Sequence, residues 1–556
     1  MKSKSNLQTF IASPLFLFLL FGLSALALTY PLPLSLFSQI PLGDEKVGAV
    51  PFFNLWTLQW NIDQLMFGYP DYWNAPIFAP LTGTFAFSET QLLSALLAAP
   101  LWLGLQSLPF AYNSLVLFFL TCNGWFGYWL LKAWGASGLV ALVTGLIIQA
   151  LPFVAQEMGV LQLVAIFGFL WSLLFLSRFL AQRRRGQTHW PTIICLALGL
   201  PVTFFTCSYY GLFSLLFLPL AFLFLAERFD LKAAGQLLLA ALLSLALTAP
   251  LLWTQQQQLA QYGFSRSAQT VENNSARLID YSNTLDHNLL YGRLLARPAR
   301  VGQRLFPGLG LILLAALGIW GRSQRRVKLY LAVAAILALL LSLGLRLRLG
   351  ELQPYQWLRD YLPGLAQLRS PFRFAMLVQL HLALLAGFGL THVRQWLAHR
   401  PAGRAVLVGA AALVLVESLA LPLPLQPLPP LQSRAPWQNW LNTLDSPPRL
   451  VMLPFAPTSA VADFEQTTLW MLESRYFQGR MLNGYSGFFP KHHAELREHM
   501  LRFPTPEGLA LLRQMQVDYV IVYHRLPQAP RPEKLLDVLP PVYRDNQNHV
   551  SIYALD

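Results

Sequence analysis

The sequence carries little charge for its length. Of its 556 residues, 12% are Asp, Glu, Lys or Arg, whereas 55% are hydrophobic. Soluble globular domains usually contain about 25% charged residues. This deficit of charge, together with repeated long apolar runs, excludes an ordinary soluble protein and predicts a polytopic membrane protein.

Cysteines are also scarce, and several short functional motifs are absent. The three cysteines, Cys122, Cys195 and Cys207, lie in or beside apolar segments and have neither metal-binding nor disulfide spacing. There is no Gly-x-Ser-x-Gly, no P-loop and no dinucleotide-binding glycine fingerprint, which argues against an ATP-driven pump. The net charge of +14 is spread between apolar runs and forms no basic domain with interleaved aromatic residues, so nucleic acid is not an expected partner.

Apolar stretches of spanning length recur along the chain and predict about 11 transmembrane helices. They lie near residues 10–30, 111–132, 138–157, 161–181, 190–206, 208–226, 233–253, 305–321, 329–345, 373–391 and 405–422. The first is long enough to span, so we expect a retained anchor instead of a cleaved signal peptide. The run 91–108 is shortened by Pro100 and Pro109, and we expect it to lie on the outer leaflet or dip into it.

With 91–108 excluded from the spans, the N-terminus is predicted to be cytoplasmic and the C-terminus extracytoplasmic. The basic residues of the connections then gather on the cytoplasmic side, which is the positive-inside pattern. They are Lys2, Lys4, Lys132, Arg178, Arg183, Arg184, Arg185, Arg228, Lys232, Arg322, Arg325, Arg326, Lys328, Arg394, Arg400 and Arg404.

The predicted fold is therefore mainly α, a multi-pass bundle followed by a small C-terminal α/β domain. The transmembrane domain covers 1–422 and includes a first outer loop, 31–110, with juxtamembrane helices. A Pro-rich, semi-rigid linker covers 423–430, and an extracytoplasmic domain covers 431–556. In that domain we expect buried strands at 449–454 and 518–523, helices at 492–502 and 507–516, and closing strands near 542–543 and 549–553.

An acidic pair, Asp44 and Glu45, opens the first outer loop. A carboxylate just outside a membrane can act as a base on a substrate held at the lipid surface. The alternative is a solvated turn acid followed by an interfacial belt formed by Trp56 and Trp60. Glu89 is a second acid in the same loop and could converge with Asp44 on one site, or cap the helix that follows it.

Further polar residues are expected at the outer membrane face. Glu157 at the outer end of the third span and Gln162 at the start of the fourth belong either to the headgroup layer or to a cavity. Arg369 and Arg373 could hold a phosphate or pyrophosphate group, or extend to lipid headgroups. We also consider Tyr209, Tyr210, Trp56 and Trp60 as substrate-binding residues, although aromatic residues at this depth are commonly belt residues.

No cofactor is predicted with certainty. The acidic pair has no cluster of His or Cys nearby, so a zinc or iron site is not expected. A divalent cation held by carboxylates alone stays open, because such sites need only oxygen ligands.

The order of these pieces resembles the GT-C superfamily of integral-membrane glycosyltransferases. The resemblance spans nearly the whole chain and points to a largely uncharacterised bacterial branch. It rests on Gly43-Asp44, Asn54, Trp56, Trp60, residues 76–80, 86–89, Tyr112-Asn113, residues 208–210, 290–292, 305–308, 368–373 and 483–488.

The resemblance implies an enzyme of the bacterial inner (plasma) membrane. Such an enzyme moves a sugar from a polyprenyl-phosphate donor to an extracytoplasmic glycan, lipid or protein acceptor, usually with inversion. Asp44 matches the catalytic acid and would be the general base, whereas Glu89 matches a second polar site residue and Glu45 would be a bystander. Two departures are Lys46, the base nearest to the acid, and the absence of a His before Gln162.

Two functions of other classes remain as alternatives. One is a non-catalytic lipid or polysaccharide translocation factor that keeps the arginines but does not require Asp44. The other is an envelope scaffold whose C-terminal domain recruits a partner.

Overall fold

The computed structural model describes residues 13–227, 230–298, 302–362, 364–401, 403–431, 434–531, 535 and 538–555. The chain forms two compact units. Unit 1 comprises the residues up to Glu45, Phe110–Pro250 and Ser265–Leu425, and unit 2 comprises Lys46–Pro109, Leu251–Phe264 and the residues from Gln426 onward. Lys2, Lys4, Arg228 and the first residues of the 10–30 stretch lie outside the described residues.

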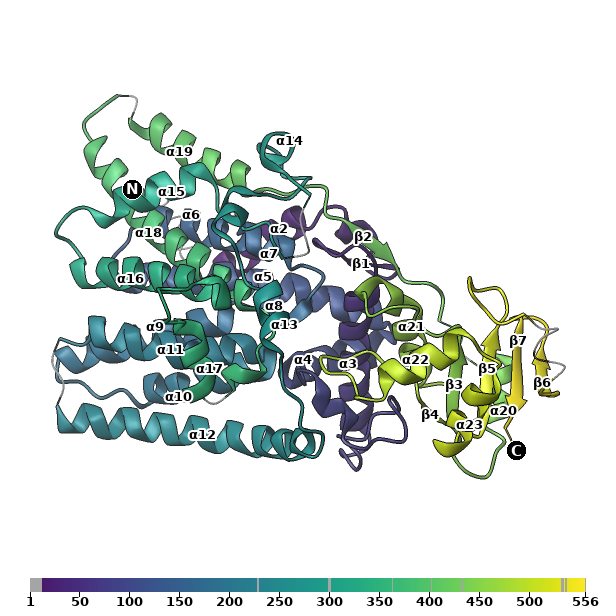
Figure 1. Cartoon of the computed structure of the whole chain (residues 1–556). Helices are drawn as coiled ribbons and strands as arrows, with labels where there is room; N and C mark the ends of the chain where they lie inside the picture. The colour runs from purple at the N-terminus through teal and green to yellow at the C-terminus, as the bar shows by residue number, and fades with distance from the viewer. Residues whose placement is uncertain are drawn as a thin grey trace. The chain divides into compact units, whose positions relative to one another are not determined.

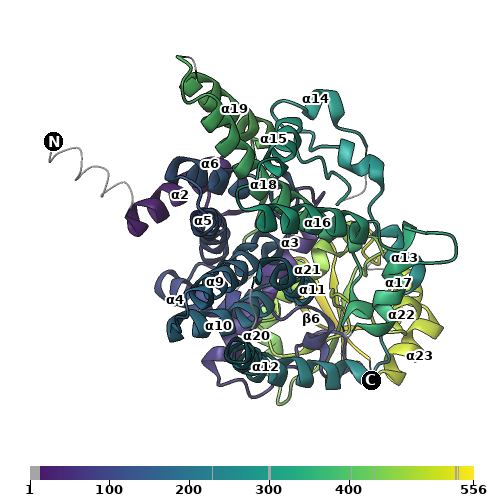
Figure 2. The ribbon, with the colours of Figure 1, turned by 90° about the vertical axis from the view of Figure 1, so that its left-hand side faces the viewer.

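Unit 1 is built from helices, and a helix lies at every predicted span. In Figure 1, α9, α10, α11 and α12 run across unit 1, and Figure 2 looks down α11 and α12. The helices at the predicted spans are α2 (Pro14–Leu28), α5 (Leu108–Ala133), α6 (Gly138–Gln149), α9 (Phe167–Arg184), α10 (Trp190–Thr206), α11 (Ser208–Leu225), α12 (Leu231–Ala260), α15 (Leu309–Ile319), α16 (Arg325–Ser342), α18 (Ala375–Trp396) and α19 (Gly403–Ser418).

Six helical segments among the described residues are long and apolar enough to cross a membrane, and five shorter apolar helices accompany them. The six are Leu108–Ala133, Gly138–Gln156, Leu161–Arg184, Ser208–Leu225, Leu231–Ala260 and Pro371–Trp396. These segments indicate a multi-pass membrane protein. The full count of eleven crossings and their direction stay predictions.

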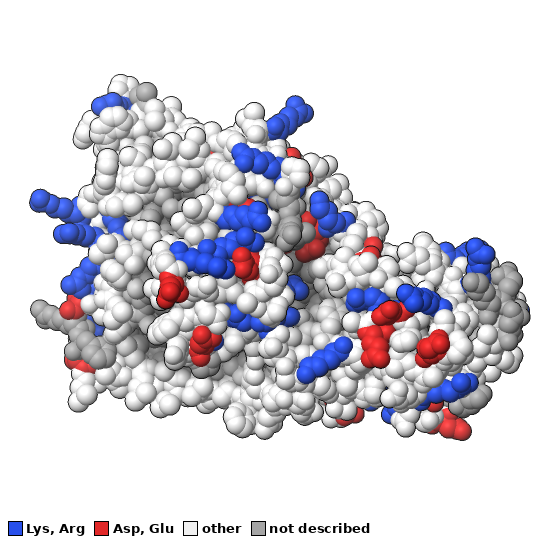
Figure 3. Space-filling view, in the orientation of Figure 1, with Lys and Arg blue, Asp and Glu red and all other residues white. Residues whose placement is uncertain are grey.

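The exposed surface of α12 is apolar and nearly free of charge. After Lys232 the helix contains no charged residue, and Leu238, Leu242 and Leu245 are exposed. Figure 3 shows that charged side chains are sparse over most of the visible surface. A long exposed helix without charge is suited to lipid contact, because hydrocarbon does not solvate ionised side chains.

Helices α15 and α18 of unit 1 pack closely because each has a glycine at the contact. A Cβ atom on Gly318 of α15 would lie 2.0 Å from the Leu385 carbonyl oxygen of α18. A Cβ atom on Gly389 of α18 would lie 2.0 Å from the Leu314 carbonyl oxygen of α15. Only residues without a side chain allow this approach, and such small residues commonly mark helix interfaces in membranes.

Unit 2 contains the predicted α/β domain. Its five-stranded sheet has the order β4-β3-β5-β7-β6, with β3 parallel to β4 and β5, and β7 antiparallel to β5 and β6. The predicted strands and helices are confirmed. The elements are β3 (Arg449–Leu453), β4 (Arg480–Met481), β5 (Tyr519–Tyr523), β6 (Pro541–Asp545), β7 (Val550–Ala554), α20 (Pro436–Leu441), α21 (Glu465–Glu473), α22 (His493–Leu501) and α23 (Pro506–Gln514).

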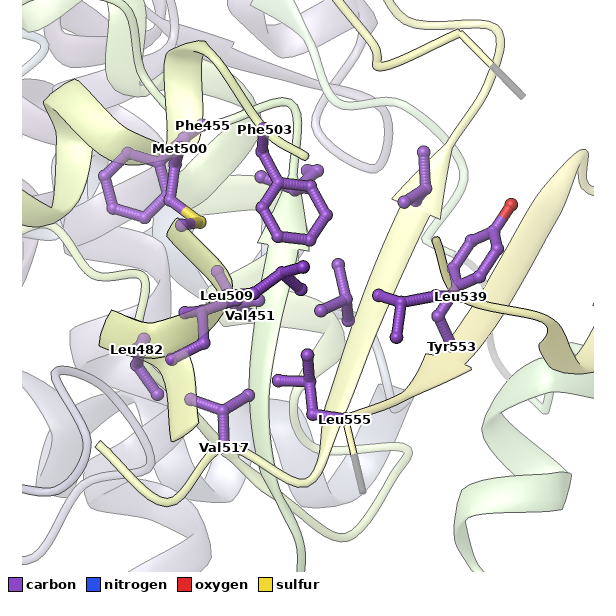
Figure 4. Packing of buried hydrophobic residues seen from close by; sticks show 14 of the residues in the cluster. Val451, Phe455, Leu482, Met500, Phe503, Leu509, Val517, Leu539, Tyr553 and Leu555 are labelled. Atoms are coloured by element: carbon purple, nitrogen blue, oxygen red, sulfur yellow. The ribbon is translucent and has the colours of Figure 1, made fainter. Parts of the chain in front are cut away.

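The core of this domain follows from its apolar strands. Residues 450–453 of β3 are all fully buried, as expected for a strand that is covered on both faces. Figure 4 shows Val451, Phe503 and Leu509 among the side chains of the hydrophobic cluster beside the sheet. Leu512 of α23 belongs to the same cluster and has no exposed surface.

Residues 46–109 of the first outer loop also belong to unit 2, which the sequence did not indicate. Its helix α3 (Ala49–Met66) packs on α21, and Gln59 donates a hydrogen bond to the Leu472 carbonyl oxygen at 3.2 Å. The run predicted to lie along the outer leaflet forms α4 (Leu92–Leu105), which packs on α3.

We expect Leu512→Ala to lower the free energy of unfolding of unit 2 by about 2–5 kcal/mol, because it leaves a cavity in the core. Leu501→Ala is the matched control, because Leu501 in α22 is 47% exposed. Thermal unfolding followed by tryptophan fluorescence measures both variants, and the buried Trp437 and Trp470 lie in unit 2. Equal melting temperatures for the two variants would contradict the described core.

Candidate active site

The loop that carries Asp44 is fixed against a turn of unit 1 by its backbone. The Asp44 N–H donates to the Gln156 carbonyl oxygen at 2.8 Å, and the Leu42 N–H donates to the Pro424 carbonyl oxygen at 2.9 Å. Pro424 directly precedes β2 (Leu425–Pro427), which pairs with β1 (Gln39–Pro41). The bond to Gln156 places residues 42–45 on the turn that follows α7 (Pro152–Gln156), and the bond to Pro424 ties them to the segment before β2.

Two glycines make this contact possible. Gly43 has φ +61°, and a Cβ atom there would lie 2.4 Å from the Gln156 carbonyl oxygen. A Cβ atom on Gly159 would lie 2.2 Å from the Leu42 carbonyl oxygen. Both positions therefore require a residue without a side chain, and Gly43 also uses a backbone conformation that glycine adopts without strain.

Asp44 forms a buried ion pair that the sequence did not predict. Its Oδ1 lies 2.9 Å from Nη1 of Arg304, and the two side chains are 5% and 6% exposed. The Arg304 backbone N–H donates to Oε1 of Gln156 at 3.0 Å, and its Nη2 lies 3.0 Å from Oδ2 of Asp286. Arg304 thus joins the acid of the first loop, the turn after α7 and a second carboxylate.

Gln379 of α18 links the backbone of α7 to the backbone next to Arg304. Its Oε1 accepts the Phe153 N–H at 2.8 Å, and its Nε2 donates to the Leu305 carbonyl oxygen at 3.1 Å. Sequence reasoning missed Gln379 and Arg304. Arg304 had one available signal, since it is a basic residue at the predicted outer end of a span, against the usual charge bias.

Two further acids lie beside Asp44. Glu157 is 3% exposed, and its Oε1 accepts a hydrogen bond from Gln156 Nε2 at 2.8 Å. Glu45 is half-buried, and a Cβ atom on Gly159 would lie 3.3 Å from its Cγ. Glu45 therefore lies over the same turn and keeps part of its side chain accessible.

The electrostatic environment favours the neutral forms of both glutamates. Burial and, to a smaller extent, the charges of Glu157 and Asp44 raise the pKa of Glu45 to about 7, against the opposing effect of Arg373 and Arg369. Burial also raises the pKa of Glu157, against the opposing effect of Arg373. Glu45 thus titrates near neutral pH, which sequence reasoning did not anticipate for an expected bystander.

A group of arginines completes the site. The guanidinium of Arg373 lies over the Tyr209 ring, 4.3 Å from its centre, and the Arg369 N–H donates to the Tyr209 hydroxyl at 3.3 Å. Burial lowers the pKa of Arg266 to about 10, and the positive charges of Arg369 and Arg373 act in the same direction. Positive charges are therefore crowded here, and a bound phosphate would relieve their repulsion.

The structure brings together some of the predicted site residues. Asp44, Glu157, Tyr209, Arg369 and Arg373 form the polar group of unit 1 described above.

Two other predicted residues of unit 1 are buried in its packing. Tyr210 has no exposed surface and donates its hydroxyl to the Leu163 carbonyl oxygen at 2.7 Å. Gln162 is 8% exposed. The substrate-binding role of both residues stays a prediction.

The remaining predicted residues lie in unit 2. Trp56 is 3% exposed and stacks on Phe53 and Trp60, so it serves mainly the packing of the loop. Trp60 is half-buried and donates its indole N–H to the Tyr72 carbonyl oxygen at 3.0 Å. Glu89 is half-buried and precedes α4.

The open question of a divalent cation gains no support from the site. Among the described residues, no group of three or more His, Cys, Asp or Glu side chains is placed to hold a metal ion. Arg304 already compensates the charge of Asp44.

Comparison with solved structures identifies the fold. The chain is similar to two cryo-EM classes of the mycobacterial arabinofuranosyltransferase AftD, with 14% sequence identity and TM-scores of 0.60 and 0.59. The chain has a GT-C-like fold. The match covers 97–98% of this chain but only 41% of the AftD chain, so this protein spans less than half of that length. The predicted resemblance to GT-C glycosyltransferases is thus confirmed at the level of the fold.

A second solved structure aligns with the chain at a lower TM-score. ArnT from Cupriavidus metallidurans, bound to undecaprenyl phosphate, aligns over 97% of this chain and 98% of its own at 12% identity, with a TM-score of 0.46. No protein-family model and no curated protein sequence matches the chain.

We expect Gly159→Ala to destabilise unit 1 by about 1–3 kcal/mol, because the added methyl group would overlap the Leu42 carbonyl oxygen. Gly235→Ala is the control, since a Cβ atom at Gly235 in α12 meets nothing within 4 Å. Thermal unfolding in detergent measures both variants. A Gly159→Ala protein as stable as the control would show that residues 42–45 do not pack on this turn.

Proposed function

We propose that this protein transfers a sugar from a polyprenyl-phosphate donor to an acceptor at the extracytoplasmic face of the bacterial inner membrane. The observation that carries the proposal is one polar group in a multi-pass membrane protein, in which a buried carboxylate, two further acids and crowded arginines lie together. The name of AftD, an arabinofuranosyltransferase with a similar fold, supports glycosyl transfer as the reaction class.

Asp44 is the proposed general base. Its carboxylate takes the proton of the acceptor hydroxyl, which requires the two oxygen atoms to approach within about 2.6–3.2 Å. The ion pair with Arg304 fixes the orientation of the Asp44 carboxylate. A catalytic role for Glu89, which lies in unit 2, stays a prediction.

The arginines are proposed to receive the leaving group. The acceptor oxygen forms a bond to the anomeric carbon of the sugar while the bond from that carbon to the phosphate oxygen breaks. The bonding electron pair leaves with the phosphate, and Arg369 and Arg373 neutralise the charge that develops there. The ring of Tyr209 holds Arg373 in position through the cation–π contact.

The proposal also assigns each part of the chain to a side of the membrane. The N-terminus is cytoplasmic, and the bundle of 1–422 crosses the membrane about eleven times. The C-terminal domain, 431–556, lies outside the membrane and meets the glycan, lipid or protein acceptor. Substrate binding by Trp56 and Trp60, both in unit 2, stays a prediction.

Asp44→Asn is expected to reduce sugar transfer by about 100-fold or more, because the amide cannot accept the hydroxyl proton. Membranes that contain the variant and a radiolabelled polyprenyl-phosphate sugar provide the assay. Asp71→Asn, at an exposed position of unit 2, is the matched control. Undiminished transfer by Asp44→Asn would rule out Asp44 as the base and favour the translocation alternative.

Arg373→Ala is expected to weaken binding of the lipid phosphate by about 10- to 100-fold, as a charge-assisted hydrogen bond contributes about 1.5–3 kcal/mol. Arg373→Lys should give an intermediate loss, because lysine keeps the charge but not the planar fork. The exposed Arg293→Ala is the control. Binding of undecaprenyl phosphate to the purified protein in nanodiscs measures all three, and equal affinities would contradict the assignment.

A further inference from the structure

A second group of arginines lies at the other end of α18 from Arg369 and Arg373. Arg373 lies just before α18 and Arg394 in its last turn, so the 22-residue helix, about 30 Å long, separates them. The group, named the distal arginine group, consists of four exposed residues, Arg322, Arg325, Arg394 and Arg400. Figure 3 shows blue side chains at the end of unit 1 where the turn between α15 and α16 lies in Figure 1. The distal arginine group is thus separate from the proposed donor site.

The turn between α15 and α16 packs on the last turns of α18, which brings the arginines of both segments to one end of unit 1. Nε2 of His392 in α18 lies 2.5 Å from the Trp320 carbonyl oxygen. A Cβ atom on Gly321 would lie 2.5 Å from Cε1 of the same histidine. Arg322 directly follows Gly321, and Arg394 lies two residues after His392.

Arg400, in the turn after α18, is held by an aromatic ring. Its guanidinium lies 4.1 Å from the centre of the Trp396 ring. The Arg400 N–H donates to the Leu397 carbonyl oxygen at 3.0 Å, and the Gly403 N–H donates to the Arg400 carbonyl oxygen at 2.9 Å. Trp396 and Trp320 are 66% and 71% exposed. Exposed tryptophans at the ends of apolar helices are typical of the headgroup layer of a membrane, so the distal arginine group lies at the depth of lipid phosphates.

The charge of the distal arginine group is not compensated by acids of the chain. The sequence contains neither Asp nor Glu in residues 287–350 or in residues 361–416. Within the part of the chain that the structure describes, none of the four arginines forms an ion pair. Arg183 and Arg184 of the same unit, by contrast, pair with carboxylates at 2.7 and 2.9 Å. The distal arginine group therefore needs negative charge from outside the chain.

We propose that the distal arginine group binds the headgroup of an anionic phospholipid whose acyl chains lie along α15. The phosphate diester supplies the negative charge, and guanidinium groups present forked N–H donors to phosphate oxygens. Leu313 and Leu317 of α15 are 57% and 40% exposed and share a helix face that ends at Trp320. This apolar face adjoins the arginines and suits a lipid instead of a free phosphate. Clusters of Lys and Arg between helices at a membrane surface bind lipids of this charge.

The test measures binding of phosphatidylglycerol to the full-length protein in detergent by native mass spectrometry. Phosphatidylcholine with the same acyl chains is the zwitterionic reference, and the wild type should bind phosphatidylglycerol about tenfold more tightly. Arg322→Gln/Arg394→Gln removes one arginine from each segment. This variant should bind phosphatidylglycerol about 25-fold more weakly, since each Lys or Arg near an anionic lipid contributes about fivefold, and should bind phosphatidylcholine as the wild type does.

Two further variants separate charge from folding. Arg293→Gln/Arg348→Gln removes two exposed positive charges elsewhere in unit 1 and should bind phosphatidylglycerol like the wild type. Arg322→Lys/Arg394→Lys keeps the charge and should retain most of the affinity, whereas a purely structural role of the arginine side chains would give the same loss as glutamine. Melting temperatures of the variants verify that each protein is folded.

Photolabelling locates the bound lipid. Phosphatidylglycerol with a diazirine in one acyl chain should label peptides of α15 in the wild type and much less in Arg322→Gln/Arg394→Gln. Equal affinity of the wild type for phosphatidylglycerol and phosphatidylcholine would overturn the proposal. The same holds if the glutamine variant binds phosphatidylglycerol as tightly as the Arg293→Gln/Arg348→Gln control, or if its α15 is labelled as strongly as that of the wild type.

Discussion

The candidate site depends on the contact between the loop 42–45 and the turn 156–159. At this contact the backbone of one segment lies against the backbone of the other, and a methyl group at Gly43 or Gly159 would collide with a carbonyl oxygen. The contact removes Asp44 and Glu157 from water and places Glu45 beside them. Because charged groups are costly to bury, the surrounding arginines become necessary parts of the structure.

This arrangement divides the acids into two kinds. Asp44 is paired with Arg304 at 2.9 Å, so its charge has a fixed partner. Burial raises the pKa of Glu45 and of Glu157, whereas Arg373 has the opposing effect on both. Within one short loop, adjacent residues thus acquire different chemistry from their different neighbours.

Much of the fold could be predicted from the sequence. The apolar stretches predicted a helix at each of the eleven positions, and the apolar runs near 449 and 518 predicted β3 and β5. The site was predicted less completely. Asp44, Arg369 and Arg373 were noticed as charges at the outer ends of spans, whereas Gln156 and Gln379 carried no comparable signal. Glutamines in apolar helices become recognisable only when their partners, such as the Phe153 N–H, are known.

The sequence by itself determined a chain of long apolar helices with a small α/β domain, because hydrophobic length and periodicity are local properties. Only the tertiary structure decided that Asp44 pairs with Arg304, 260 residues away, and that Glu45 shares its surroundings with Glu157 and two arginines. The tertiary structure also decided that residues 46–109 of the first outer loop pack with the C-terminal domain in one unit. Burial and charge partners depend on contacts between distant segments, and those contacts decide the protonation behaviour of each carboxylate.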